Sequence, residues 1–123
     1  MAVKAVDASA LAAVLFGEPA AETIEARLRD AVLVAPRLIE YELGNTCWKK
    51  CRRYPELSDA LRESFASLED LPLQLHDVDA GAVLGVAQAL GLTYYDASYL
   101  WLARQLRVEL VSLDERLMSA AAS

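Results

Sequence analysis

Acidic side chains at the ends of predicted elements are the residues of this sequence best suited to chemistry. Asp7 and Asp114 each end a predicted strand and begin a predicted helix, and Asp96 begins a helix after residues 92–95. Glu42 lies one or two turns inside its predicted helix. Open α/β sheets place their sites at such strand ends. We therefore expect the three aspartates at one edge of a sheet, with Glu42 leaning over the same edge.

Each of these acids also has a purely structural interpretation. Asp7, Asp96 and Asp114 are acceptable helix N-caps or first-turn residues, and Glu42 is acceptable on a solvated helix face. The apolar neighbours of Asp7 and Asp96 favour a site, because an unpaired carboxylate is costly in such surroundings. A divalent cation would remove that cost. Carboxylate oxygens are hard ligands that suit Mg²⁺ or Mn²⁺.

The composition is that of one folded domain with a substantial core. The 123 residues include 55% hydrophobic and 24% charged side chains, with only 5 Gly and 4 Pro, which excludes disorder and low complexity. The 12 Lys and Arg against 18 Asp and Glu give a net charge of −6, which argues against a broad cationic surface for nucleic acid. A metal ion held by carboxylates would still let an acidic protein bind a phosphodiester.

The cysteines and the hydropathy pattern bear on the compartment. Cys47 and Cys51 lie four residues apart in a predicted helix and do not form the disulfide framework of a small secreted domain. A zinc site would need two further ligands, and the single histidine, His76, is distant in sequence. No stretch resembles a signal peptide or a membrane span. We expect a cytoplasmic protein with reduced thiols.

Strand and helix signals alternate along the chain. Apolar runs predict strands at residues 3–6, 31–35, 73–78 and 108–113. Helical spacing and capping signals predict helices at residues 9–16, 19–30, 36–53, 56–70 and 79–90, with two more beginning near 95 and at 114. This alternation is typical of an α/β fold with a mostly parallel central sheet and helices on both faces, formed here by residues 1–123 as a single domain.

Five short segments link the sequence to a known family. They are VDASAL at 6–11, APRL at 35–38, YELGN at 41–45, YDASYL at 95–100 and SLDERL at 112–117. With them the chain resembles, over nearly its whole length, a PIN-domain ribonuclease of the VapC toxin type. The resemblance implies catalytic, metal-binding roles for Asp7, Glu42, Asp96 and Asp114, with Ser9 and Asn45 supporting the site.

The same resemblance implies an activity and partners. PIN-domain toxins use Mg²⁺ or Mn²⁺ to activate a water that cleaves single-stranded RNA, and they are usually dimers held by an antitoxin protein. Apolar helices near the N-terminus are then candidate partner surfaces. Covalent catalysis has little support, because His76 has no plausible nucleophile as a partner.

Several alternatives stay open at this point. The chain could be an RNA-processing PIN nuclease without an antitoxin, or a non-catalytic binding domain; a phosphatase would need a second acid beside Asp7, which is absent. The cluster of Lys49, Lys50, Arg52 and Arg53 fits a helix C-terminus as well as a phosphate-tracking role. The aromatic residues, among them Trp48, are more often core or interface material than base-stacking groups.

Overall fold

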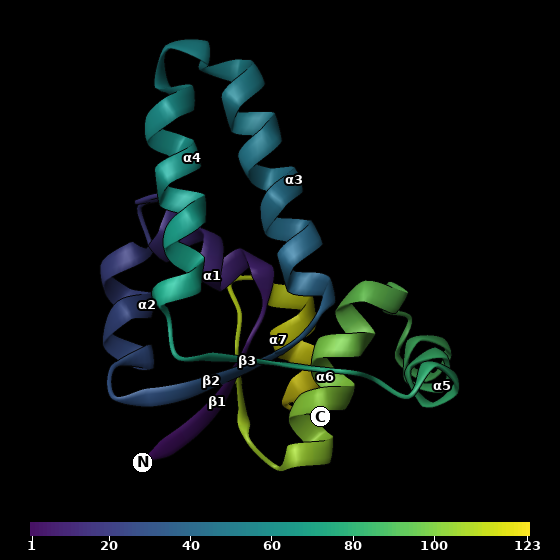
Figure 1. The fold of residues 1–123 in the computed structure, drawn as a ribbon. Coiled ribbons are helices and arrows are strands. Elements are labelled where there is room, and N and C mark those ends of the chain that lie inside the picture. Colours follow the sequence, from purple (N-terminus) through teal and green to yellow (C-terminus); the bar gives the residue numbers. More distant parts are fainter.

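A four-stranded parallel sheet forms the centre of the computed structural model, which describes residues 1–123 (Figure 1). The strands are β1 (Ala2–Val6), β2 (Ala31–Pro36), β3 (Leu73–His76) and β4 (Glu109–Val111), in the spatial order β3-β2-β1-β4. Every neighbouring pair is parallel. The predicted parallel α/β sheet is confirmed, and the central position of β1 brings the end of β4 beside its own.

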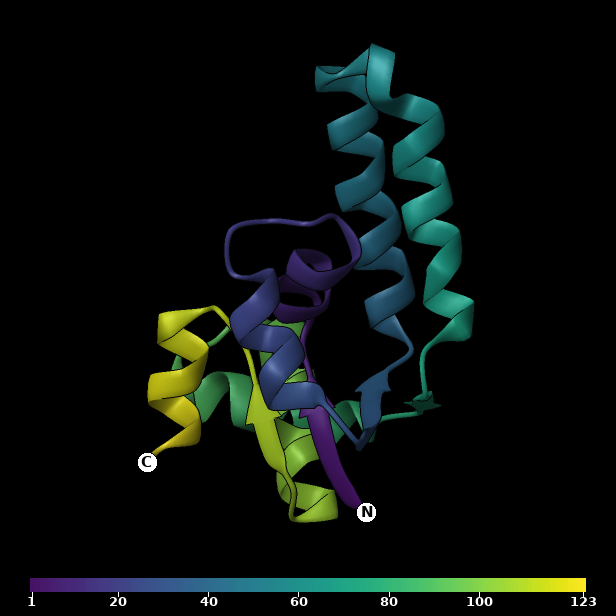
Figure 2. The ribbon, with the colours of Figure 1, turned by 90° about the vertical axis from the view of Figure 1, so that its left-hand side faces the viewer.

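Seven helices surround this sheet. They are α1 (Ala8–Leu15), α2 (Ala21–Leu28), α3 (Leu38–Arg53), α4 (Ser58–Ala66), α5 (Ala80–Leu90), α6 (Tyr94–Leu106) and α7 (Glu115–Ala121). Helices α1 and α2 lie on one side of the sheet and α6 on the other (Figures 1 and 2). Helices α3 and α4 form a hairpin that projects from the domain. No helix combines the length and the apolar content that crossing a bilayer requires.

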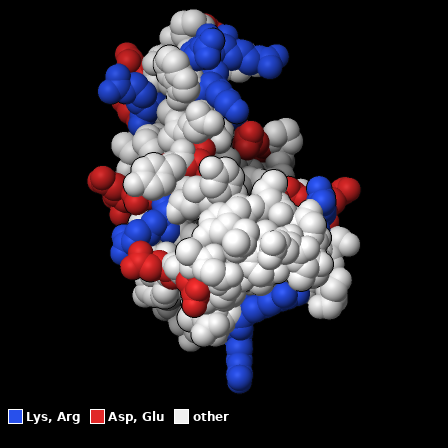
Figure 3. All heavy atoms as spheres, turned by 90° about the vertical axis from the view of Figure 1, so that its right-hand side faces the viewer, with Lys and Arg blue, Asp and Glu red and all other residues white.

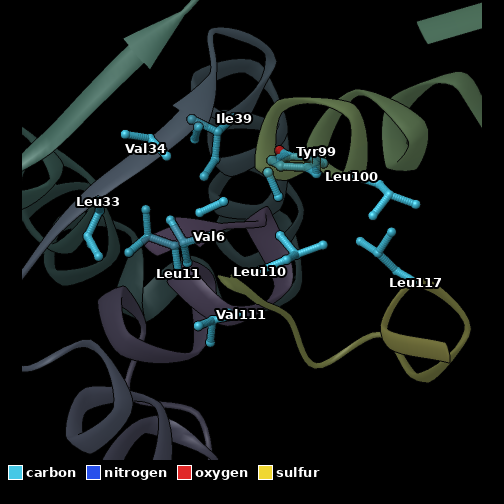
Figure 4. Close-up of a cluster of buried hydrophobic side chains, with 14 of the residues drawn as sticks. Val6, Leu11, Leu33, Val34, Ile39, Tyr99, Leu100, Leu110, Val111 and Leu117 are labelled. Carbon is cyan, nitrogen blue, oxygen red and sulfur yellow. The ribbon is translucent and has the colours of Figure 1, made fainter. Parts of the chain in front are cut away.

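The core lies between the sheet and the helices that cover it. Strand residues such as Val6 and Val111 are fully buried, because both faces of the sheet are covered. Leu11 of α1 and Leu100 of α6 add side chains from the helices (Figure 4). Each such buried side chain contributes about 1.5–3 kcal/mol relative to an exposed one. This packing gives the acidic edge a rigid base.

Two predicted helix starts at proline are wrong. Pro36 is the last residue of β2 and pairs in register with His76, so α3 begins only at Leu38. A proline at a strand end is tolerated where its missing N–H is not needed by the ladder. Pro19 lies in a turn, and α2 begins at Ala21.

The predicted helix over residues 56–70 is also divided. The α-helical part is α4 alone, with the 3-10 turns η1 (Pro55–Leu57) before it and η2 (Ser67–Asp70) after it. Tighter 3-10 turns are common at the ends of α-helices, and a periodic apolar stripe does not distinguish them from helix. The strand predicted at 108–113 is only three residues long, because the chain leaves the sheet after Val111 to reach Asp114.

Candidate active site

Two of the predicted acids sit at the carboxyl ends of adjacent strands. Asp7 follows β1 directly, and its N–H donates to the carbonyl of Val111 at 3.2 Å, so the ends of β1 and β4 are joined at this point. Asp7 is the N-cap of α1 and accepts from Ala10 N–H at 3.0 Å. Asp114 is the N-cap of α7 and accepts from Leu117 N–H, also at 3.0 Å. The capping interpretation and the site interpretation therefore apply to the same side chains.

Asp7 is held in place by two serines. Its side chain is almost completely buried and accepts from Ser9 Oγ at 2.7 Å and from Ser112 Oγ at 2.6 Å. Burial raises the pKa of Asp7, the hydrogen bonds from Ser112, Ala10 and Ser9 oppose that rise, and the charge of Asp114 adds to it. The Asp7 carboxylate is therefore fixed in position, and a nearby cation would stabilise its ionised form.

Asp96 is the third residue of α6 and has a free carboxylate. The helix is capped by Thr93, whose Oγ1 accepts from the Asp96 N–H at 3.0 Å. The side-chain oxygens of Asp96 take part in no hydrogen bond or ion pair. Burial raises the pKa of Asp96, and the charges of Asp114 and Asp7 raise it further, against the opposing effects of Thr93 and Arg116. This carboxylate is available to a ligand.

Glu42 reaches the site from α3 and is oriented by a buried tyrosine. The Tyr99 hydroxyl, on α6, donates to Glu42 Oε1 at 2.6 Å. Burial raises the pKa of Glu42, the Tyr99 hydrogen bond opposes this, and the charges of Asp96 and Asp7 add to the rise. Burial and the hydrogen bond to Glu42 also raise the pKa of Tyr99, so its hydroxyl remains a donor.

The structure thus brings all four predicted acids into one electrostatic cluster. Asp7 interacts with Asp114, Asp96 with both of them, and Glu42 with Asp7 and Asp96. Each of these like-charge interactions disfavours the ionised form. A cation bound among the four carboxylates would instead favour their ionised forms.

The donor chemistry of this cluster fits a hard divalent cation. No three His, Cys, Asp or Glu side chains are close enough to form a complete metal cage. Mg²⁺, however, keeps several of its waters and is usually bound through one or two carboxylates plus phosphate oxygens. An open set of carboxylates, one of them without any protein partner, suits that mode of binding better than it suits a closed structural site.

The predicted supporting residues line a hollow beside the cluster. The hollow is about 500 Å³ in volume, and Ser9, Glu42, Asn45 and Lys49 are among the residues that line it. Ser9 Oγ also accepts from the N–H of Leu113 at 3.0 Å, which ties the loop after β4 to the start of α1. The Asn45 side chain makes no hydrogen bond within the chain and lines this hollow.

Tyr99 and Ser112 were not predicted at the site, and Lys49 was left open between a helix C-terminus and a phosphate-tracking role. Tyr99 stands three residues after Asp96, so helical spacing placed it on the same face, but aromatic residues at that spacing are usually only core. Ser112 lies two residues before Asp114 and donates to Asp7 across the sheet, a contact for which the sequence carries no local signal. Lys49 stands seven residues after Glu42, two helical turns along one face.

Replacing Ser112 with Ala should lower the stability of the protein. Ser112 Oγ donates to the buried Asp7 Oδ2 and accepts from Asp114 N–H at 2.9 Å, so the change leaves a buried carboxylate oxygen without its donor. We expect a loss of about 1–3 kcal/mol, seen as a melting temperature lower by roughly 5 °C or more. Ser119→Ala in α7, away from Asp7, is the matched control. Equal melting temperatures for the two variants would contradict the role given to Ser112.

These features define a class of protein, namely an open parallel α/β domain with an acidic site at the carboxyl edge of its sheet. The PIN domain family model matches residues 4–122, and the chain belongs to that family. Within it the chain is a VapC-type nuclease.

Curated relatives and a solved structure agree with this assignment. The chain is 32% identical to "Ribonuclease VapC3" of Pyrobaculum aerophilum, over 91% of this chain and 89% of the relative. It is 37% identical to "Exonuclease VapC9" of the same organism, over 93% and 82% respectively. The crystal structure of PAE2754 from Pyrobaculum aerophilum superposes with a TM-score of 0.69 at 32% identity, covering 98% of this chain and 87% of that one.

Proposed function

We propose that this protein is a Mg²⁺- or Mn²⁺-dependent endoribonuclease that cleaves single-stranded RNA and acts as the toxin of a toxin–antitoxin pair. The observation that carries the proposal is the convergence of Asp7, Glu42, Asp96 and Asp114 at one edge of the sheet, where burial and the neighbouring carboxylates raise the pKa values of Asp7, Glu42 and Asp96. A cation beside such a cluster favours its ionised carboxylates. That cation in turn provides a site for phosphate oxygens.

Each residue of the site has a distinct part in this mechanism. Asp7, Glu42, Asp96 and Asp114 would hold the metal, which when bound polarises the scissile phosphate and lowers the pKa of an attacking water. Ser9 and Ser112 fix the two oxygens of Asp7, and Tyr99 fixes one oxygen of Glu42. In this mechanism the carboxylates bind and orient the metal, and they do not themselves attack the phosphorus. The hollow lined by Ser9, Asn45 and Lys49 would accommodate the single-stranded RNA beside these carboxylates.

A circular single-stranded RNA tests the endonucleolytic activity directly. We expect the purified chain to linearise the circle in Mg²⁺ or Mn²⁺ and to leave it intact in EDTA, because an internal cut needs no free end and the cut depends on metal. Denaturing gel electrophoresis separates the two forms. An intact circle beside a degraded linear RNA of the same sequence would instead indicate an exonuclease. Cleavage in EDTA would contradict the proposed dependence on a metal ion.

We further propose a cognate antitoxin as the partner of this chain. VapC-type membership supports it, as does an apolar hollow of about 240 Å³ between α1, α2 and the sheet, whose lining includes Leu11, Val14 and Leu28. An apolar segment of the antitoxin would fill this hollow. A small DNA-binding protein encoded next to this gene favours the toxin role. Its absence favours the alternative, an RNA-processing PIN nuclease that works alone.

A homodimer is proposed through α5. This helix contains no charged residue, and Leu84 at its centre is 51% exposed. Figure 3 shows the broad uncharged area on this face of the molecule. Two copies of a chain with a net charge of −6 repel each other, so they approach at least electrostatic cost where neither presents a charge.

A further inference from the structure

One face of α3 carries exposed aromatic and cationic side chains, and we call it the α3 strip. Its members stand at helical spacing on the side of α3 that does not face the sheet: Tyr41, Asn45, Trp48, Lys49, Arg52 and Arg53. Tyr41 is 77% exposed and Trp48 58% exposed, so neither is core material. The strip begins beside Glu42 and ends at the tip of the α3–α4 hairpin.

The cations of the strip are free for a ligand. Lys50, the neighbouring lysine, is neutralised by Glu18 at 3.2 Å, whereas none of the chain's ion pairs includes Lys49, Arg52 or Arg53. The Arg52 guanidinium lies over the Trp48 ring, 5.5 Å from its centre. Lys and Arg side chains gather at the outer end of the hairpin (Figure 3). This is a local positive surface on an acidic protein.

We propose that the α3 strip is a binding track for the single-stranded RNA on its way to the acidic cluster. The proposal rests on the function proposed above. Proteins that bind single strands without a duplex combine cations that follow the phosphates with exposed aromatic rings on which bases stack. Lys49 supplies a phosphate contact, and Trp48, backed by Arg52, supplies a stacking surface.

The position of Lys49 joins the track to the site. Lys49 and Glu42 line the same hollow, and their separation of seven positions in sequence corresponds to roughly 10 Å along the helix. A single RNA strand can therefore contact both Lys49 and Glu42. Attraction of cations to the helix C-terminus accounts for Arg52 and Arg53 in the last turn, but it accounts neither for Lys49 in the hollow nor for Trp48 in solvent.

Binding of a fluorescent single-stranded RNA, followed by anisotropy at several salt concentrations, tests the track. All proteins carry Asp96→Asn so that cleavage does not interfere. We expect Trp48→Ala to weaken binding about tenfold, through the lost stacking contact. We expect Lys49→Ala to reduce the slope of log affinity against log salt by about 0.7, the value for one phosphate contact on a single strand.

Arg104→Ala is the matched control, since it removes one exposed charge from the far end of α6 and should change neither quantity. Thermal melts of each variant confirm that the exposed substitutions leave the fold intact. Unchanged affinity and slope in both strip variants would overturn the track and leave the strip to a protein partner. Failure of the wild-type protein to cleave RNA would overturn the proposed function alone, because the binding measurement does not depend on cleavage.

Discussion

Replacing Asp96 with Asn is expected to reduce cleavage of single-stranded RNA about a thousandfold or more. The Asp96 carboxylate has no partner in the protein and interacts with the charges of Asp7 and Asp114, so it is the acid most available to the metal. A metal ion supplies several kcal/mol of transition-state stabilisation, and about 4 kcal/mol corresponds to a factor of 10³. Initial rates on a labelled RNA in Mg²⁺ measure the loss.

The same variant separates a chemical role from a structural one. Without metal, Asp96→Asn removes a half-buried charge that repels its neighbours, so its melting temperature should equal or exceed that of the wild type. Asp59→Asn on the exposed face of α4 makes the same chemical change away from the site and should retain full activity. Wild-type rates in Asp96→Asn, or an equal loss in Asp59→Asn, would be incompatible with the acidic site.

Mn²⁺ should stabilise the wild-type protein strongly. A ligand that binds only the folded state at about 100 times its dissociation constant adds about 2.7 kcal/mol, which corresponds to roughly 10 °C in melting temperature for a chain of this size. The four acids provide the site, and the loss of one should remove most of the effect. Differential scanning fluorimetry with Mn²⁺ and with EDTA measures the shift in the wild type and in Asp96→Asn.

The direction of the pH dependence follows from the raised pKa values of Asp7, Glu42 and Asp96. Between the ordinary and the raised pKa, the folded state binds more protons than the unfolded state, so metal-free stability falls as pH rises through this window. Metal binds only the ionised carboxylates. The Mn²⁺ shift should therefore grow as the pH is raised from about 5 to about 7.5. A Mn²⁺-induced shift in melting temperature that does not depend on pH would place the metal elsewhere. The same conclusion would follow if Asp96→Asn showed the same shift as the wild type.

The main elements of the fold were predictable from local patterns. Apolar runs such as residues 31–35 mark strands that are buried on both faces, and Gly91 ends α5 in the left-handed conformation that glycine favours (φ 65°). Asp7 and Asp114 could be placed because a helix N-cap that closely follows a strand lies near the carboxyl edge of the sheet. The structure places all four predicted acids together, and their roles in catalysis remain predictions.

The partners of those acids could not be predicted, because they depend on tertiary packing. Ser112 meets Asp7 only because β4 pairs with β1, a topology that no local pattern specifies. The exposure of Trp48 depends on α4 covering only one side of α3. The start of α3 was placed two residues early, because proline is accepted equally at a strand end and in a first helical turn.

The hydrogen bonds of Asp7 have a consequence for how this protein can evolve. The Asp7 side chain caps α1, accepts hydrogen bonds from two serines and lies in the acidic cluster. A substitution at this position therefore lowers the stability of the fold, whether or not the activity is under selection. Asp96 carries no such penalty. In a lineage released from selection for catalysis, we expect Asp96 to be lost early and Asp7 to persist as a relic that records the ancestral activity.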